Sequence, residues 1–248
     1  LEGMVVEGLD VNTKFDGDRT LLHIAAASGD EKTIWFLMVN KVDINVIDEW
    51  DKTPFNRAID NYQWSVAKLL YSADMALRPE NFSKTFRDAL SKGAPPDIIK
   101  LLLPQLKGKE HEYLQDAVIR GSDFFVDHFL EHFHENPADL FEDKGFVVLM
   151  SAIGYQREDV FKRLLDAGFD YRRELKGGTN GLKHAANIGN QIILHTLMMQ
   201  CEKDGVELSR KDVLQSAISG RGIELIPDLV RYGCSSDELV EDDQKPLL

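Results

Sequence analysis

The sequence repeats itself at intervals of 33 residues, and this period limits the folds that the chain can adopt. The segments TLLHIAAASG at residues 20–29 and TPFNRAI at residues 53–59 carry threonine and alanine at matching places. The segments DVN at residues 10–12 and DIN at residues 43–45 show the same interval. Repeats of this length indicate units that stack on one another, because a single unit cannot bury its apolar face alone.

Seven alanines follow the period along the whole chain, with spacings of 33, 31, 28, 35, 33 and 32 residues: Ala25, Ala58, Ala89, Ala117, Ala152, Ala185 and Ala217. After each of these register alanines comes a segment with apolar residues at positions i, i+3 and i+4, the pattern of one helix face. The short interval predicts a shortened hairpin, and the long one predicts a loop at residues 134–139. We therefore expect an all-α solenoid of about seven stacked helix-turn-helix units joined by hairpin-like loops.

Residues 20–45 resemble an ankyrin repeat. They fit the pattern T-P-L-H-x-A-A-x-x-G and end in D-x-N, with Leu21 in place of the proline. The next unit restores Pro54 but has Asn56 for the histidine and Tyr62 for the glycine. The resemblance implies an ankyrin-repeat domain over residues 1–234 and an acidic tail at 235–248, with repeats near 13–45, 46–77, 78–107, 108–139, 140–172, 173–205 and 206–234.

The same resemblance implies roles for the small residues of each unit. The register alanines would let the two helices approach closely. Four glycines would close the first helices in a conformation with positive φ, which costs glycine little: Gly29, Gly93, Gly121 and Gly189. His23 would form hydrogen bonds within and between repeats, which is a structural role.

The charge of the chain argues against nucleic acid as a partner. The balance of 29 basic against 42 acidic residues gives a net charge of −13, whereas binding to phosphates requires basic patches. This charge suits a partner protein with a basic surface, although it could serve only to keep the chain soluble. No run approaches the ~20 apolar residues of a membrane span, so we expect no membrane association.

The sequence predicts no catalytic site, cofactor or metal. It has no phosphate-binding glycine loop, nucleophile elbow or HExxH motif. His128 and His132 are four residues apart and could share a metal, but Phe125 and Phe129 form the core stripe of that segment, which makes the histidines ordinary surface groups. The two cysteines, at positions 201 and 234, have no metal or redox spacing, and we expect incidental thiols.

In the ankyrin family, partners usually contact the hairpin tips and the exposed ends of the first helices. This resemblance places partner contacts at tip residues and at first-helix ends: Asp16, Arg19, Ser28, Glu49, Trp50, Lys52, Asp60, Asn61, Asp143, Lys144, Phe146, Tyr155, Lys176 and Asn187.

Trp50 is the strongest of these candidates, because no stacking requirement explains a tryptophan between two acidic residues at a tip. Exposed tryptophan is a favoured anchor at interfaces. The alternative is that its ring folds back over the neighbouring hairpin. Asn45 resembles the asparagine that an oxygenase hydroxylates in some ankyrin hairpins, and the alternative there is a purely structural residue.

The first function that we expect is a non-enzymatic, monomeric scaffold for a partner protein. A second is a regulatory or substrate-recruiting segment of a longer enzyme, such as a secreted effector of an intracellular bacterium, and a third is a structural spacer. Residues 8–12 match the end of a repeat whose first helix is missing, which favours a fragment of a longer protein. We expect a cytoplasmic location, or the host cytosol for such an effector.

Overall fold

The computed structural model consists of helices and describes residues 10–73, 79–106, 109–132, 144–175, 177–206 and 209–234. Its chain forms two compact units, which divide between Phe125 and Val126. The helices of unit 1 are η1 (Asp16–Asp18), α2 (Leu21–Ser28), α3 (Glu31–Val39), α4 (Pro54–Asp60), α5 (Trp64–Ser72), α6 (Pro79–Ser91), α7 (Pro96–Leu102), η2 (Leu103–Gln105), α8 (His111–Arg120) and the start of α9 (Asp123–His132). Unit 2 contains the rest of α9 and α11 (Lys144–Gly154), α12 (Glu158–Asp166), α13 (Gly181–Ile188), α14 (Gln191–Asp204), α15 (Arg210–Ser219), η3 (Gly222–Leu225) and α16 (Ile226–Arg231).

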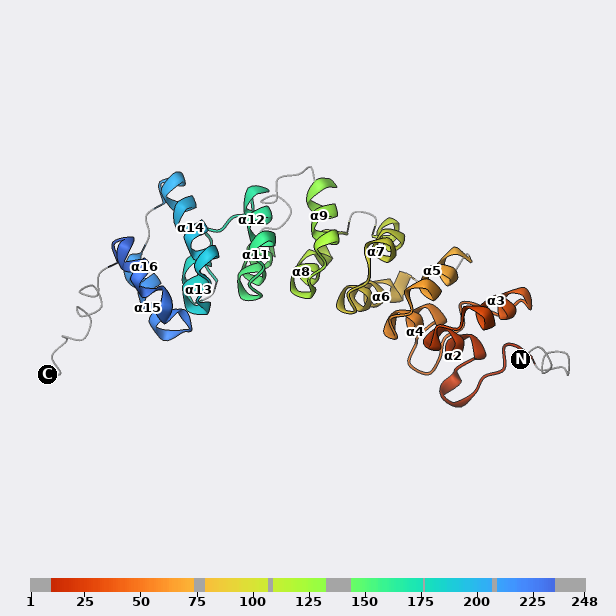
Figure 1. Ribbon diagram of the computed structural model, residues 1–248. Coiled ribbons are helices and arrows are strands. Elements are labelled where there is room, and N and C mark those ends of the chain that lie inside the picture. The colour runs from red at the N-terminus through yellow and green to blue at the C-terminus, as the bar shows by residue number, and fades with distance from the viewer. Residues whose placement is uncertain are drawn as a thin grey trace. The chain divides into compact units, whose positions relative to one another are not determined.

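The helices stack in two rows within each unit (Figure 1). In unit 1 the first helices α2, α4, α6 and α8 pack in succession, and α5 packs on α7. In unit 2 the row of first helices is α11, α13 and α15, and α12 packs on α14. This arrangement confirms the expected all-α solenoid of helix pairs.

The register alanines lie where the rows touch. All seven are buried, with at most 4% of each side chain exposed. Each allows the first helix to approach its neighbours, because a larger side chain there would force the helices apart. The predicted register is therefore confirmed.

Short polar side chains begin the helices. Asp30 and Asn190 accept hydrogen bonds from the backbone N–H groups of Thr33 and Ile193, which satisfies free donors at the starts of α3 and α14. At the start of α4, Thr53 and Asn56 bond each other's backbone N–H, and Pro54 occupies the first turn. The T-P pattern of the sequence is thus a helix-start signal.

The turn between the two helices of a pair requires a residue with positive φ. Gly29 has a φ of 79° and Gly189 a φ of 85° there, as predicted, and Gly93 and Gly121 are also positive. In the repeats without the glycine, Tyr62 adopts a φ of 61° and Gln156 a φ of 53°. These two residues keep the turn at a cost in strain that glycine avoids.

The connections between pairs differ along the chain. An isolated antiparallel bridge joins Glu174 to Asn180 in the hairpin before α13. After α7 the chain instead continues into η2, and this short turn replaces a hairpin as the 28-residue interval predicted. The loop expected at residues 134–139 lies outside the described residues.

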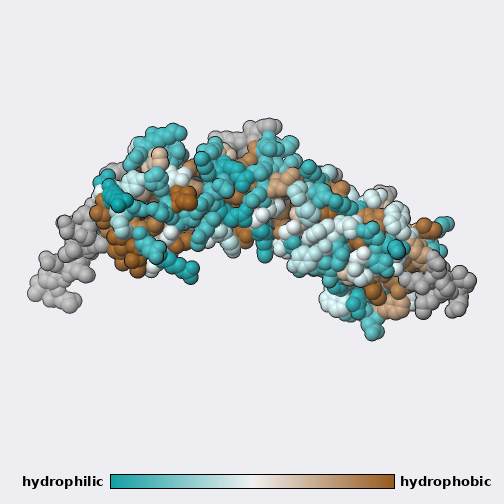
Figure 2. Space-filling model, in the orientation of Figure 1, coloured by the Kyte–Doolittle hydropathy of each residue, from teal (hydrophilic) through white to brown (hydrophobic). Residues whose placement is uncertain are grey.

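The core of each unit combines aliphatic and aromatic side chains. In unit 1, the ring of Phe86 lies 4.9 Å from that of Tyr113 and 5.2 Å from that of Phe125, measured between centroids. Phe129 is 4% exposed, as predicted for the core stripe of α9, and Phe133 lies outside the described residues. The surface in the view of Figure 2 is mostly polar with apolar islands. Among the described helices, none combines the length and the apolar character of a membrane span.

Candidate partner-binding surface

The tip that carries Trp50 is a tight turn organised by a buried carboxylate. The side chain of Asp48 is fully buried and accepts hydrogen bonds of 3.0 Å from the backbone N–H groups of Trp50 and Lys52. Asp51 has a φ of 56°, which reverses the chain. These bonds fix the backbone of the tip and therefore the direction in which Trp50 leaves it.

The Trp50 ring is held on two sides and half of it is exposed. The guanidinium carbon of Arg57 lies 4.8 Å from the ring centroid, and Arg57 is itself paired with Asp48 at 2.6 Å. A Cβ atom on Gly17 would lie 2.8 Å from the ring, so the ring rests against the preceding tip. The exposed fraction of Trp50 is 50%. The ring thus contacts the neighbouring hairpin and still presents a large apolar surface.

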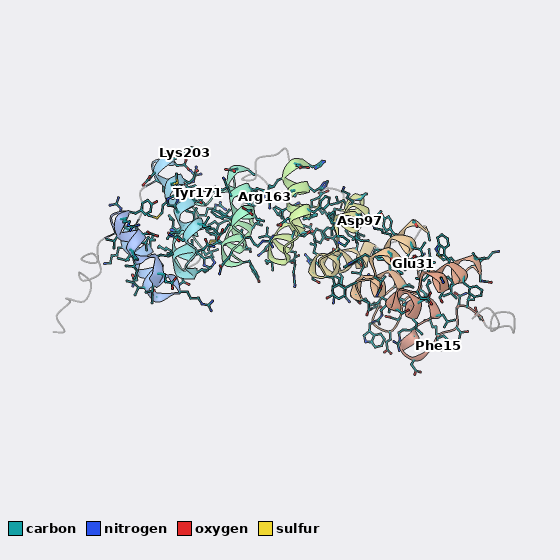
Figure 3. The ribbon with its side chains drawn as sticks, in the orientation of Figure 1. Phe15, Glu31, Asp97, Arg163, Tyr171 and Lys203 are labelled. Carbon is teal, nitrogen blue, oxygen red and sulfur yellow. The ribbon has the colours of Figure 1, made fainter. Side chains whose placement is uncertain are left out.

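The two tips are also joined through their backbones. The N–H of Glu49 donates to the carbonyl oxygen of Gly17 over 3.0 Å. Phe15, at the tip of the first hairpin in Figure 3, is 43% exposed. Two neighbouring tips of unit 1 therefore form one fixed surface with two exposed aromatic rings.

Lys52 binds carboxylates of its own chain. Its ammonium group lies 3.2 Å from Asp60 and 2.7 Å from Asp88, and 14% of the side chain is exposed. Burial lowers the pKa of Lys52, but the hydrogen bonds and charges of the two carboxylates outweigh burial and raise it. Lys52 therefore links neighbouring repeats and leaves one carboxylate charge in excess beside the tip.

The remaining predicted residues of unit 1 lie at the surface. Asp16, Arg19, Ser28, Glu49 and Asn61 are exposed. Arg19 donates from Nε to the carbonyl oxygen of Asp16 over 3.1 Å, which stabilises the first tip.

In unit 2, the predicted residues Tyr155 and Asn187 lie at the ends of the first helices α11 and α13. Tyr155 is 57% exposed and Asn187 is exposed. Asn187 borders a polar groove of about 450 Å³ between α13 and α15, which the sequence did not reveal. Lys183 and Asp212 pair across this groove at 2.9 Å.

Phe146 corrects the sequence-based prediction. We expected it at a tip, but it lies in the first turn of α11 and is 4% exposed. Its side chain is part of the core, so it cannot contact a partner. Lys144 begins α11, but its side chain lies outside the described residues, as do Asp143 and Lys176.

Asn45 belongs to a ladder of D-x-N turns. Its backbone N–H donates to Asp43 over 2.9 Å, and the N–H of Asp43 donates to the side-chain oxygen of Asn12 in the preceding turn over 2.8 Å. Asn45 itself is partly exposed. The ladder supports a structural role for the motif, and hydroxylation of Asn45 stays a prediction.

The titratable groups of the described residues serve packing. Burial lowers the pKa of His184 and raises that of Cys201. The Tyr171 hydroxyl, labelled in Figure 3, donates to Asp204 over 2.8 Å, and burial followed by this bond raises the Tyr171 pKa. No group of three or more potential metal ligands occurs in the parts of the chain that the structure describes.

Comparison with known proteins agrees with the resemblance. A family model for the ankyrin repeat matches residues 17–49. The ankyrin-repeat domain of human ASB11 superposes with a TM-score of 0.64 at 18% identity, covering 81% of this chain and 91% of that one. The chain has the ankyrin-repeat fold. The ankyrin-repeat domain of Bcl-3, a member of the IkappaB family, gives a TM-score of 0.56 at 19% identity, covering 87% of this chain and all of that one.

Two relatives by sequence share only a short stretch with this ankyrin-repeat chain. A Caenorhabditis elegans protein named "Putative glutaminase 2" is 40% identical over 82 residues, which is 33% of this chain and 13% of that protein. Serine/threonine-protein kinase 12 of Arabidopsis thaliana is 33% identical over 70 residues, 28% of this chain and 15% of the kinase. The chain thus spans a small part of the length of these relatives.

Proposed function

We propose that the chain is a protein-binding scaffold whose main contact surface is the pair of tips around Trp50. The observation that carries the proposal is that the ring is half exposed and yet fixed by Arg57 and Gly17. A rigid, exposed tryptophan loses little conformational freedom on binding, which is the property of an interface anchor. Ankyrin-repeat domains generally bind proteins, and this supports the same function.

The partner that fits this surface is a basic segment. Exposed carboxylates surround the ring at Asp16, Glu49 and Asp51. The basic groups nearby are engaged with the chain itself, Arg57 with Asp48 and Lys52 with two carboxylates. An arginine or lysine of a partner could therefore stack on Trp50 and be neutralised by these carboxylates.

The test compares Trp50→Ala with Trp35→Ala. Trp35 is a matched control because it is 56% exposed on α3, away from the tips. We expect peptides selected from a random library on the unmodified protein to be rich in arginine and lysine. Calorimetry should then show affinity reduced about 30-fold by Trp50→Ala, the effect of losing ~2 kcal/mol at a hot spot. Trp35→Ala should leave the affinity unchanged.

Two results would contradict the proposal. One is an equal loss of affinity in both variants, which would point to a general effect of removing tryptophan. The other is retention of full affinity by Trp50→Ala, which is also what a structural spacer predicts. A thermal midpoint for Trp50→Ala close to that of the unmodified protein would show that any loss arises from the contact itself.

A second candidate function is that of a regulatory or substrate-recruiting segment in a longer enzyme, such as a secreted bacterial effector. The two relatives favour it, since both carry the names of enzymes and the match covers 13% and 15% of their lengths. A catalytic motif in the reading frame that flanks this chain would support this function. Frames without one would favour a binding module alone.

We also propose a cytoplasmic location for the monomeric chain, or the host cytosol for an effector, and Asn45 as a substrate of an asparagine hydroxylase. The support for the modification is the partly exposed D-x-N turn that Asn45 closes. Cell fractionation tests the location. Intact mass after incubation with such an oxygenase tests the modification, which requires the gain of one oxygen at Asn45.

A further inference from the structure

One apolar position is buried in the inner repeats and exposed in the last. It is the residue directly after the register alanine. In the five repeats whose successor belongs to the same unit it is at most 1% exposed: Ala26, Ile59, Leu90, Ile153 and Ala186. In the last repeat the equivalent residue is Ile218, which is 46% exposed.

The second helix of the last repeat shows the same change. Thirteen residues after the register alanine, Leu102 is fully buried and Met198 is 5% exposed, whereas Val230 is 53% exposed. Ile223 in η3 is also 61% exposed. Figure 2 shows the apolar surface gathered over α15 and α16. We call Ile218, Ile223 and Val230 the terminal face.

The preceding repeat shows what normally covers such a face. Ala186 on α13 is covered by the last repeat, whose α15 packs along α13. The approach is so close that a Cβ atom on Gly222 would lie 1.9 Å from the carbonyl oxygen of Ala186. The natural cover for the terminal face is therefore another helix pair with a small, closely fitting first helix.

The sequence that follows keeps the register of the repeat. Residues 235–248 lie outside the described residues, so only their sequence is considered. Pro246 and Leu247 stand 192 residues after Pro54 and Phe55, and Leu247 stands 33 residues after Leu214. Phe55 and Leu214 are 1% and 2% exposed, so Leu247 falls on a core position of the repeat.

We propose that the terminal face is a stacking surface for a further ankyrin repeat, and that residues 245–248 hold the sequence of its first turn. A single turn cannot cover the face by itself, because the backbone entropy of ordering it exceeds what so few side chains return. The occupant is a complete helix pair, which buries the terminal face as the last repeat buries Ala186.

The test extends the full chain in register. A copy of residues 57–78 is added after Leu248, so that residues 246–248 take the place of residues 54–56 in a complete repeat. Ile218→Cys is introduced as a reporter, because Cys201 and Cys234 are both buried. In the extended chain we expect labelling of the new thiol to slow at least tenfold and the thermal midpoint to rise by about 4 °C.

The matched control carries the same extension with aspartate at the copies of Ala58 and Ile59, which prevents the added helix from packing. It should label as fast as the unextended chain. Equal labelling of the extended and unextended chains would overturn the proposal. So would slow labelling of the unextended chain together with a dimer in sedimentation, because a second copy of the chain would then cover the terminal face.

Discussion

At the scale of single residues, one position at the start of each first helix shows how different side chains perform the same task. His23 accepts from the backbone N–H of Thr20 through Nδ1 over 3.1 Å, and its Nε2 lies 2.9 Å from the Lys52 carbonyl oxygen of the next repeat. Since Nδ1 is an acceptor, the proton must lie on Nε2. Asn56 takes this place in the second repeat, accepting from Thr53 and donating to Thr85 over 2.7 Å. Each side chain caps its own helix and links it to the next repeat.

This geometry makes stability depend on pH. Burial lowers the pKa of His23, although the bond to the Lys52 carbonyl opposes the effect. As the pH falls from 7.5 to 5, the unfolded chain takes up a proton at a pH near 6.5 that the folded chain still refuses, so the free energy of unfolding falls. Urea unfolding at both pH values should show a smaller fall for His23→Asn, which copies Asn56. The difference in slope is at most about 1.4 kcal/mol per pH unit. An identical fall would assign the pH dependence to other groups, of which His184 is one.

At the scale of helices, close approach decides how the last two repeats of unit 2 join. The N–H of Arg221 donates to the Asn187 carbonyl oxygen over 2.6 Å. Cβ atoms on Gly220 and Gly222 would come within 2.1 Å of the carbonyl oxygens of Asn187 and Ala186. The turn before α16 therefore lies directly against the end of α13, which only glycine allows.

Replacing Gly222 by alanine should separate these helices. The new methyl group would overlap backbone atoms that cannot move aside, so we expect a loss of about 3 kcal/mol, the upper part of the range for overpacking. Gly205→Ala is the control. Its φ of 66° is strained for alanine, but no atom lies within 4 Å of the added carbon, so a loss of about 1 kcal/mol is expected. Equal losses in chemical unfolding would show that the close approach contributes nothing.

At the scale of the whole molecule, a stack of repeats is stabilised by contacts between neighbours. The chain contains two compact units, and within each a repeat packs on the next. Stability in such a chain is nearly a sum of local terms, so that a defect spreads only to nearby repeats.

Hydrogen exchange should reveal this locality. In the Gly222→Ala variant, amides of α13, α15 and α16 should lose protection, whereas those of α2 and α4 in unit 1 should exchange as in the unmodified protein. Mass spectrometry of peptides from both units measures the difference. A uniform loss of protection along the chain would mean that the protein unfolds as a single cooperative unit, and the description by neighbouring contacts would be wrong.

The sequence by itself determined the helix pairs and their register. Alanine spacing, the T-P helix starts and the closing glycines act over a few residues, and they are therefore visible in a one-dimensional pattern. The exposure of Trp50 and Tyr155 also agrees with their expected place at tips and helix ends. The same local rules did not show that Tyr62 and Gln156 would adopt the conformation of the missing glycines.

Only the tertiary structure decided what each side chain touches across repeats. It turned Phe146 into the core, engaged Lys52 with Asp60 and Asp88, and laid Trp50 against Gly17. Such contacts join residues about 30 positions apart in sequence. They depend on how closely successive helix pairs approach and on which rotamer each side chain then finds free, and neither quantity is contained in the spacing of residues along the chain.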